Sequence, residues 1–167
     1  LFGVRDKHAR AHLKTLQIME EIEEIVLWDE DREALERVRL EQGQKVSAVY
    51  THCDSLLDEQ EILFAVAAVP NDRSAQICTR LVEAGVHVIS EKPIGLDAEE
   101  TSTVVDAAAK SGVQLAVYYT NRFHPVFLEA RRLTQTGLIG RVTSCEARII
   151  ASQVKFRNPR SWLFDKE

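Results

Sequence analysis

The sequence predicts an α/β fold in which helices cover both faces of a parallel sheet. Over the first 120 residues, short apolar runs alternate with stretches in which apolar residues recur every three or four positions. One run, Ile62–Val69, is apolar at eight consecutive positions, which is typical of a central strand covered on both faces. Strands separated by helices of this length indicate βαβ units with right-handed crossovers, and therefore a doubly wound sheet.

The first part of the chain predicts strands and helices in alternation. Leu1–Gly3 is interpreted as the end of a strand, and Ala9, Leu13 and Leu16 form one apolar helix face. The elements expected up to Tyr50 are a helix at His8–Leu16, a strand at Ile25–Trp28, a helix at Asp31–Glu41 that stops at Gly43, and a strand at Val46–Tyr50.

The same alternation continues to residue 120. The expected elements are a strand at Ile62–Val69, a helix at Arg73–Ala84, a strand at Val86–Ile89, a helix from Asp97 to Gly112, and a strand at Val113–Tyr118. Gly85 and Gly112 stand where helices commonly end in a left-handed residue. Asp97 and Glu100 have the spacing of a capping box.

Residues 121–167 predict the beginning of a second domain. The pattern favours a helix at Pro125–Leu133, a turn at Gly137–Gly140 and a long strand at Val142–Val154. The chain lacks an initiator Met and ends soon after the apolar residues Trp162–Phe164, so we expect a polypeptide trimmed at both ends, with this second domain incomplete.

Composition excludes several classes of function. The 167 residues carry a net charge of -5, which leaves no basic excess for a nucleic-acid backbone. The longest apolar stretch is far shorter than the roughly 20 residues of a membrane-spanning helix, and no signal peptide opens the chain, so we expect a cytoplasmic protein. Cys53, Cys78 and Cys145 include no CxxC pair and are expected to be reduced thiols.

Ligands of such sheets bind beyond the carboxyl ends of the strands, and four of these ends carry polar residues. They are Gly3–His8, Asp29, Pro70–Asn71 and Glu91–Pro93. Asp29 lies 26 positions after Gly3, near the spacing at which a carboxylate binds an adenosine ribose. Its charge would repel a 2′-phosphate, which favours NAD over NADP. The alternative is a helix-capping or solvated Asp in the acidic run 29–31.

The loop after the first strand departs from the dinucleotide fingerprint. Gly3 is the only glycine before Gly43, so the three glycines that let a pyrophosphate approach are missing. Arg5 or Lys7 could supply charge to a phosphate, whereas Asp6 would obstruct one. The loop predicts a modified mode of diphosphate binding, a lost site, or a site for another phosphorylated ligand.

Lys92 is the candidate catalytic residue. It stands on a stiff turn at a strand end, in the tripeptide Glu91-Lys92-Pro93, whose Lys-Pro bond is a candidate for the cis form. Hydride transfer from a carbinol needs a group that takes the hydroxyl proton or steadies the charge on oxygen, and a partly desolvated lysine can do either. The alternative is an ordinary surface lysine.

No metal site is expected. His8 and His12 are one helical turn apart, but no carboxylate or thiol at ligand spacing completes a set, which favours a role in helix packing. No nucleophile elbow is present either.

Three blocks in this order and spacing resemble the Gfo/Idh/MocA family of oxidoreductases. They are Ala65-Val66-Ala67-Ala68-Val69-Pro70-Asn71, Ala84-Gly85-Val86-His87-Val88-Ile89-Ser90-Glu91-Lys92-Pro93, and Asn121-Arg122-Phe123-His124-Pro125. The resemblance covers the whole chain. It implies a dinucleotide-binding Rossmann domain at residues 1–120, followed by the start of a substrate and oligomerisation domain with an open, mostly antiparallel sheet.

The resemblance also implies a role for individual residues. It places Lys92 beside the nicotinamide and the substrate hydroxyl, with Asn121 and Arg122 near the substrate. The expected cofactor site comprises Gly3, Val4, Arg5, His8, Asp29, Ala68, Pro70, Asn71, Glu91, Lys92 and Pro93. The implied activity is NAD(P)-dependent hydride transfer to or from a sugar, polyol or related small molecule, by a homo-oligomer.

The chain departs from the family pattern at three places. The glycine loop is replaced, Ser74 stands where many members have histidine, and the family's Asp and His catalytic motif would lie beyond residue 167. The missing glycines leave a non-catalytic binding or assembly module as the alternative function.

Overall fold

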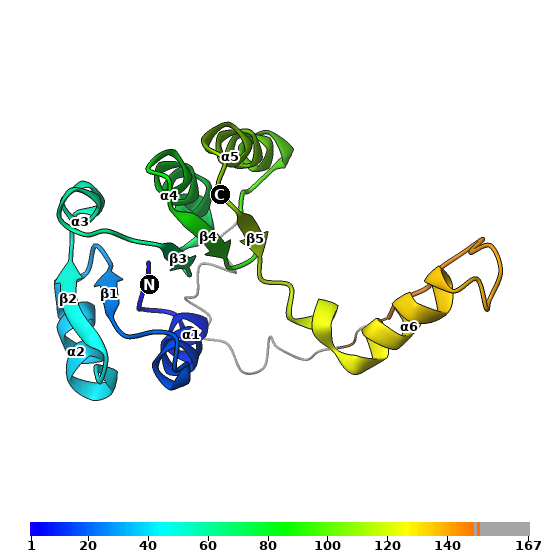
Figure 1. Ribbon diagram of the computed structural model, residues 1–167, viewed down its shortest axis with the longest axis horizontal. Helices are drawn as coiled ribbons and strands as arrows, with labels where there is room; N and C mark the ends of the chain where they lie inside the picture. Colours follow the sequence, from blue (N-terminus) through cyan, green and yellow to red (C-terminus); the bar gives the residue numbers. More distant parts are fainter. Residues whose placement is uncertain (149, 151–167) are drawn as a thin grey trace. The chain divides into compact units, whose positions relative to one another are not determined.

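A parallel sheet runs through residues 1–121 of the computed structural model, which describes residues 1–148 and 150 (Figure 1). The chain forms two compact units, Leu1–Asn121 and the part from Arg122 onward. The strands of the first unit are β1 Ile25–Trp28, β2 Val46–Tyr50, β3 Phe64–Ala67, β4 His87–Ser90 and β5 Leu115–Val117.

The beginning of the chain lies in the middle of this sheet. Phe2 forms parallel bridges to Trp28 of β1 and to Ala67 of β3, so the order across the sheet is β2, β1, Phe2, β3, β4, β5. The Phe2 N–H donates to the Val66 carbonyl at 2.8 Å, and the Gly3 N–H donates to the Trp28 carbonyl at 2.7 Å. These bonds place Leu1–Gly3 in the parallel sheet, in agreement with the strand predicted for this segment, although Phe2 forms only an isolated bridge. The order of strands reverses here, and a reversal of this kind defines a topological switch point.

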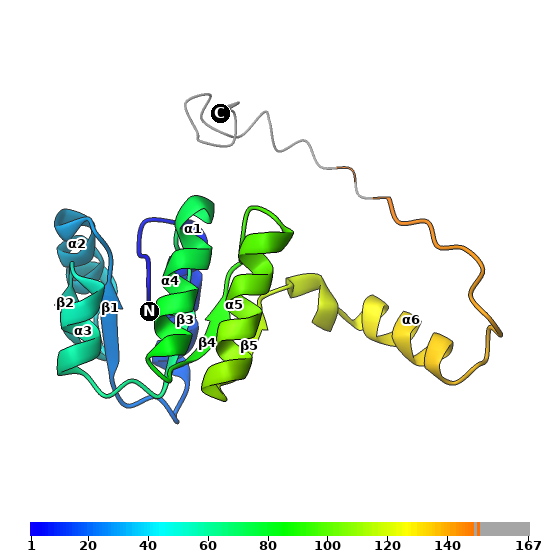
Figure 2. The same ribbon diagram turned by 90° about the horizontal axis from the view of Figure 1, so that it is seen from above.

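Helices cover both faces of the sheet. They are α1 Lys7–Ile18, α2 Arg32–Gln42, α3 Cys53–Glu59, α4 Asn71–Glu83 and α5 Ala98–Ser111. Figure 1 shows α1 and α2 on one face and α3, α4 and α5 on the other, and Figure 2 shows the same layers from above. The doubly wound sheet predicted from the sequence is therefore confirmed.

Each face of the sheet has its own apolar core. Leu13, Leu27 and Leu35 belong to the cluster under α1 and α2, and all three are fully buried. Phe2, Ile77, Leu81 and Val104 belong to the cluster under α3, α4 and α5. Burial of an aliphatic side chain of this size contributes about 1.5–3 kcal/mol, so both faces contribute substantially to the stability of the sheet.

Helix α3 was missed by the sequence analysis. It contains only seven residues, of which Cys53 and Leu56 are buried. Two inward positions in two turns are too few to establish a helical period.

Strands β3 and β5 are shorter than the runs that predicted them, whereas β1 and β2 have the predicted bounds. The run Ile62–Val69 contributes only Phe64–Ala67 to β3, because each of these residues pairs with one of the four residues of β4. Leu63 lies before the ladder and is 77% exposed. Hydrophobicity alone does not show where the neighbouring strand ends, so the prediction of eight strand residues was wrong.

Helix α5 ends as the sequence predicts. Asp97 accepts the Glu100 N–H at 2.9 Å, and Gly112 adopts a left-handed φ of 70°. The Glu100 carboxylate accepts the Leu96 N–H rather than the Asp97 N–H, so the predicted capping box forms with its reciprocal bond displaced by one residue.

The second unit contains helix α6, Pro125–Gln135, which the sequence predicted to end two residues earlier. A short 3-10 helix, Thr120–Phe123, spans the boundary between the units. The strand expected at Val142–Val154 does not form in residues 142–148 or at Ile150. A strand requires a partner, and no strand pairing occurs among the described residues of this unit. Residues 149 and 151–154, and also Trp162–Phe164, lie outside the described residues.

Candidate functional site

Several carboxyl-terminal strand ends meet at the switch point around a small cleft of about 60 Å³. The cleft is lined by Asp6, His8, Ala68, Val69, Asn71, Glu91 and Lys92. Five of these residues, His8, Ala68, Asn71, Glu91 and Lys92, belong to the predicted cofactor site. Asp6 was expected to obstruct a phosphate, and Val69 was not singled out. The predicted residues Gly3, Val4, Arg5, Asp29, Pro70 and Pro93 do not line this cleft.

Gly3 allows the first strand to pass close to β3. Its φ is +87°, and a Cβ at this position would lie 2.3 Å from the Ala68 carbonyl oxygen. The Ala68 N–H also donates to the Phe2 carbonyl at 2.7 Å, which fixes the two segments side by side. A glycine is therefore required here by both the backbone conformation and the available space.

Carboxylate side chains accept hydrogen bonds from backbone N–H groups in the loop between Gly3 and α1 and in the first turn of the helix. The buried Val4 N–H donates to Asp29 Oδ2 at 2.9 Å. Asp6 is the N-cap of α1 and accepts the His8 N–H at 2.8 Å. These carboxylates therefore occupy one N–H group of the loop and one N–H group of the first turn of α1.

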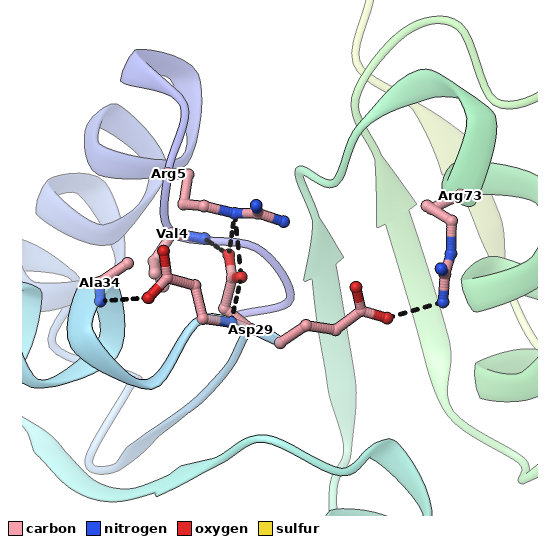
Figure 3. Close-up of polar contacts among 7 residues, drawn as sticks. Val4, Arg5, Asp29, Ala34 and Arg73 are labelled. Atoms are coloured by element: carbon pink, nitrogen blue, oxygen red, sulfur yellow. Dashed lines mark hydrogen bonds and ion pairs between the residues drawn. The ribbon is translucent and has the colours of Figure 1, made fainter.

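Asp29 is a buried carboxylate, 2% exposed, at the end of β1 (Figure 3). Its Oδ1 lies 3.0 Å from Arg5 Nε and accepts the Asp31 N–H at 3.0 Å. Its Oδ2 accepts from Val4 N–H and lies 3.3 Å from Arg5 Nε. The predicted ribose contact of Asp29 stays a prediction, and the structure adds that protein donors already reach both oxygens.

An ion pair joins the turn after β1 to helix α4. Glu30 Oε1 lies 2.7 Å from Arg73 Nη2, and Asp31 caps α2 by accepting the Ala34 N–H at 2.9 Å (Figure 3). All three acidic residues of this turn are thus engaged with protein groups.

Glu91 brings together two histidines from α1. Its Oε1 lies 2.9 Å from His12 Nε2 and 3.3 Å from His8 Nδ1. The His12 ring also makes an edge contact with Tyr118, with ring centroids 4.8 Å apart. This carboxylate partner of the histidines could not be predicted, because 79 positions separate Glu91 from His12 in the sequence and only the fold brings them into contact.

Lys92 is exposed, on the turn that follows β4. The Lys92 N–H donates to Glu91 Oε2 at 3.2 Å, and the Glu91 N–H donates to the Ala67 carbonyl at 2.7 Å. The Lys92–Pro93 bond is cis, as the sequence suggested. The ammonium group is thus carried by a turn that is tied both to β3 and to the α1 histidines.

Pro70 and Asn71 begin helix α4 beside this turn. Pro70 is the N-cap residue, and its carbonyl accepts the Arg73 N–H at 2.9 Å. Ser74 is buried, with its Oγ 3.3 Å from Ser90 Oγ. This contact connects α4 to the last residue of β4.

Asn121 and Arg122 fall on either side of the boundary between the two units. Both are exposed in the 3-10 helix. Their predicted substrate contacts remain predictions.

No three His, Cys, Asp or Glu side chains within residues 1–148 and 150 are arranged to hold a metal ion. His8 and His12 instead contact the Glu91 carboxylate directly. None of the helices in this part of the chain is both long enough and apolar enough to cross a membrane.

The residues around the cleft fit a nicotinamide dinucleotide in their chemistry. Ala68 leaves room beside the strand ends, and the first turns of α1 and α4 contribute His8 and Asn71 to the lining. Lys92 contributes a cation, which a diphosphate or a reacting oxygen can use. Asp6, which lines the cleft, narrows the approach that three glycines normally leave open.

Comparison with known proteins gives the same assignment. The sequence profile of an oxidoreductase family with an NAD-binding Rossmann fold matches residues 2–119. Levoglucosan dehydrogenase of Pseudarthrobacter phenanthrenivorans is 31% identical over 113 residues, which are 67% of this chain and 29% of that protein. Inositol 2-dehydrogenase of Rhizobium meliloti is 32% identical over 89 residues, 53% of this chain and 27% of that protein.

Solved structures agree on the fold. Scyllo-inositol dehydrogenase from Lactobacillus casei, solved with NAD(H) and scyllo-inositol, superposes with a TM-score of 0.75 at 23% identity, covering 85% of this chain and 42% of that one. The WlbA dehydrogenase from Bordetella pertussis, solved with NADH and UDP-GlcNAcA, gives a TM-score of 0.76 at 23% identity, covering 84% and 40%. The chain spans between a quarter and a third of the length of the two curated relatives above.

Proposed function

This chain belongs to the Gfo/Idh/MocA family of oxidoreductases, and on that premise we propose that it binds a nicotinamide dinucleotide for hydride transfer. The proposed reaction moves a hydride between the nicotinamide and a carbinol carbon of a sugar, polyol or related small molecule. The observation that carries the proposal is Lys92, held at the mouth of the sheet in a cleft shared with the first turn of α1. This is the edge at which open parallel sheets bind nucleotides.

Lys92 has the proposed role of proton carrier. When bound, the nicotinamide ring supplies the group that accepts or donates the hydride. The Lys92 amine takes the hydroxyl proton as a carbinol is oxidised, and its ammonium returns the proton in the reverse direction. Glu91 holds the turn through the Lys92 N–H. Asn121 and Arg122 are proposed to contact the substrate.

Within this cofactor class we propose NAD in preference to NADP. The turn after β1 carries Asp29, Glu30 and Asp31 in succession, and the negative charge that their ion pairs with Arg5 and Arg73 leave uncompensated gives NAD a modest advantage over a cofactor with a 2′-phosphate. The proposed cofactor contacts are those predicted from the sequence, of which Ala68, Asn71 and Glu91 line the same cleft as Lys92.

We further propose a homo-oligomer that assembles through the second domain, and a cytoplasmic location. The location is supported by the thiols of Cys53 and Cys78, which are free and buried, as expected in a reducing compartment.

Titration with NADH tests the proposal directly. Trp28 is 5% exposed and immediately precedes Asp29, so its fluorescence should transfer to bound NADH in a saturable manner. Absence of saturable binding of both NADH and NADPH would overturn the proposed function.

Replacement of Lys92 separates this function from the non-catalytic alternative. We expect Lys92→Ala to retain NADH binding and to lower turnover by about 10²–10⁴, the usual contribution of a general acid or base. The alternative, a non-catalytic binding or assembly module suggested by the missing glycines, predicts that Lys92→Ala leaves every measured property unchanged.

A further inference from the structure

We propose that Arg5 neutralises the negative charge of Asp29 and thereby weakens the preference for NADH over NADPH that this carboxylate would otherwise impose. The inference rests on the proposed function, because it concerns how the same site treats the adenosine ribose. An unmasked carboxylate at the end of this strand accepts the ribose hydroxyls and repels a 2′-phosphate. In this chain the Asp29 carboxylate is held by Arg5, so it can neither accept the ribose hydroxyls nor strongly repel a 2′-phosphate.

The contacts of Asp29 occupy both of its oxygens. Arg5 Nε lies 3.0 Å from Oδ1 and 3.3 Å from Oδ2. The Asp31 and Val4 N–H groups donate to Oδ1 and Oδ2, respectively. With the side chain only 3% exposed, a ribose hydroxyl can reach this carboxylate only after Arg5 moves away.

Arg5 itself faces the solvent. Its side chain is 49% exposed, and it uses Nε rather than its terminal nitrogens to contact Asp29. Figure 3 shows the two terminal nitrogens turned away from the carboxylate. The group presented beside the end of β1 is therefore a guanidinium, which prefers a phosphate to a neutral hydroxyl.

The neighbouring acidic residue is neutralised in the same way. Glu30 pairs with Arg73 at 2.7 Å, and Asp31 is engaged as the cap of α2. Two of the three negative charges that should repel a 2′-phosphate are thus balanced by arginines. The remaining preference for NAD should be small, within about tenfold in affinity, since a single like charge at contact distance in water costs about that much.

The test is the ratio of the NADH and NADPH dissociation constants, measured by fluorescence titration of this chain and its variants. We expect Arg5→Ala to weaken NADPH binding about tenfold relative to NADH, because the exposed Asp29 charge then acts on the 2′-phosphate. Arg5→Lys keeps a cation at this position and should retain most of the original ratio. The double variant Arg5→Ala with Asp29→Asn removes both charges and should restore the original ratio of the two dissociation constants.

Arg10→Ala is the matched control. Arg10 lies on α1, five positions after Arg5, and its guanidinium pairs with Glu41 at 3.4 Å rather than with Asp29. Its removal changes the net charge by the same amount and should leave the ratio unchanged. Titration with AMP and with adenosine 2′,5′-bisphosphate repeats the comparison on the adenosine half alone.

The possible outcomes distinguish this inference from the proposed function. Saturable binding of both cofactors with the same ratio in the original protein and in Arg5→Ala would overturn the inference and leave the proposed function standing. An original protein that already excludes NADPH by a hundredfold would also overturn it. Failure of both cofactors to bind would overturn the proposed function and this inference together.

Discussion

Gly3 allows the first segment of the chain to lie directly against Ala68, one of the residues that line the cleft. The Ala68 carbonyl occupies the place where a Cβ would stand, and the backbone adopts a φ of +87°. We expect Gly3→Ala to lower the free energy of unfolding by about 3 kcal/mol, because it combines a backbone clash with a left-handed conformation. Urea denaturation followed by circular dichroism measures this loss.

Gly85→Ala is the matched control for Gly3. Gly85 has a similar φ of +82°, but no atom lies within 4 Å of an added Cβ. It should lose only about 1 kcal/mol, the cost of the left-handed conformation alone. Equal losses at the two glycines would contradict the role given to the Ala68 carbonyl.

Cys78 is a buried thiol on helix α4, and its ionisation makes the stability of the fold depend on pH. Burial raises the pKa of the Cys78 thiol above its ordinary value, although Ser90 and Ser74 act in the opposite direction. The folded state therefore keeps this proton at a pH where the unfolded chain, with a thiol pKa of about 8.5, has lost it. This contribution to stability is complete below the unfolded-state pKa and is lost as the pH rises through the folded-state pKa.

We expect the urea midpoint of the protein to fall more steeply between pH 8 and pH 10 than that of Cys78→Ala. The variant removes the ionisable thiol while leaving the serines in place. Cys53, whose thiol pKa is also raised chiefly by burial, remains in both proteins. Parallel pH profiles would show that the Cys78 thiol does not contribute.

The candidate site was only partly predictable at this scale. The rule that ligands bind at strand ends grouped His8, Ala68, Asn71, Glu91 and Lys92, which line one cleft, and their cofactor contacts stay predictions. The partners of Asp29 and Glu91 could not be predicted, because they depend on side-chain rotamers and on contacts between distant segments. His12 was assigned to packing for this reason, although it lies 2.9 Å from Glu91.

At the scale of elements, signals at helix ends were more informative than strand lengths. Asp97 and Gly112 carry the conformations that define the ends of α5, and both follow from local chemistry. The extent of β3 depends instead on the four residues of β4 that pair with it. A strand boundary is a property of two segments, which explains why the apolar run alone predicted too long a strand.

Asp97→Ala tests the helix cap. The aspartate accepts the Glu100 N–H at 2.9 Å on an exposed turn, so its removal should cost about 1 kcal/mol of unfolding free energy in urea. Asp97→Ser retains an acceptor and should recover most of this loss. An equal loss of unfolding free energy in both variants would show that Asp97 does not stabilise the protein as a hydrogen-bond acceptor for the helix cap.

At the scale of the whole chain, the cores that hold the sheet lie in residues 1–121. The two apolar clusters extend no further along the described chain than Val117. We expect a chain ending at Asn121 to unfold in urea with the same midpoint as the 167-residue chain. A large decrease would show that residues from Arg122 onward contribute to the stability of the sheet.

The fold class was predictable because alternation of strands and helices is a property of the whole chain and tolerates local errors. Neither the short α3 nor the overlong prediction for β3 altered the order of elements. The strand expected at Val142–Val154 failed in the described residues because its pairing partner is not found in the described part of that unit. A long apolar pattern without a neighbour cannot establish a sheet.

The central claim is that the carboxyl ends of the strands, with Lys92 at their rim, bind the nicotinamide cofactor. The most direct measurement is amide NMR of the isotopically labelled chain during an NADH titration. We predict saturable shifts at Val4, Arg5, Ala68, Asn71 and Lys92.

A second cavity of about 250 Å³, lined by Leu1, Ile22 and Gln60–Phe64 among others, lies at the opposite ends of the strands. Shifts confined to that cavity, with the amide of Lys92 unchanged, would contradict the claim.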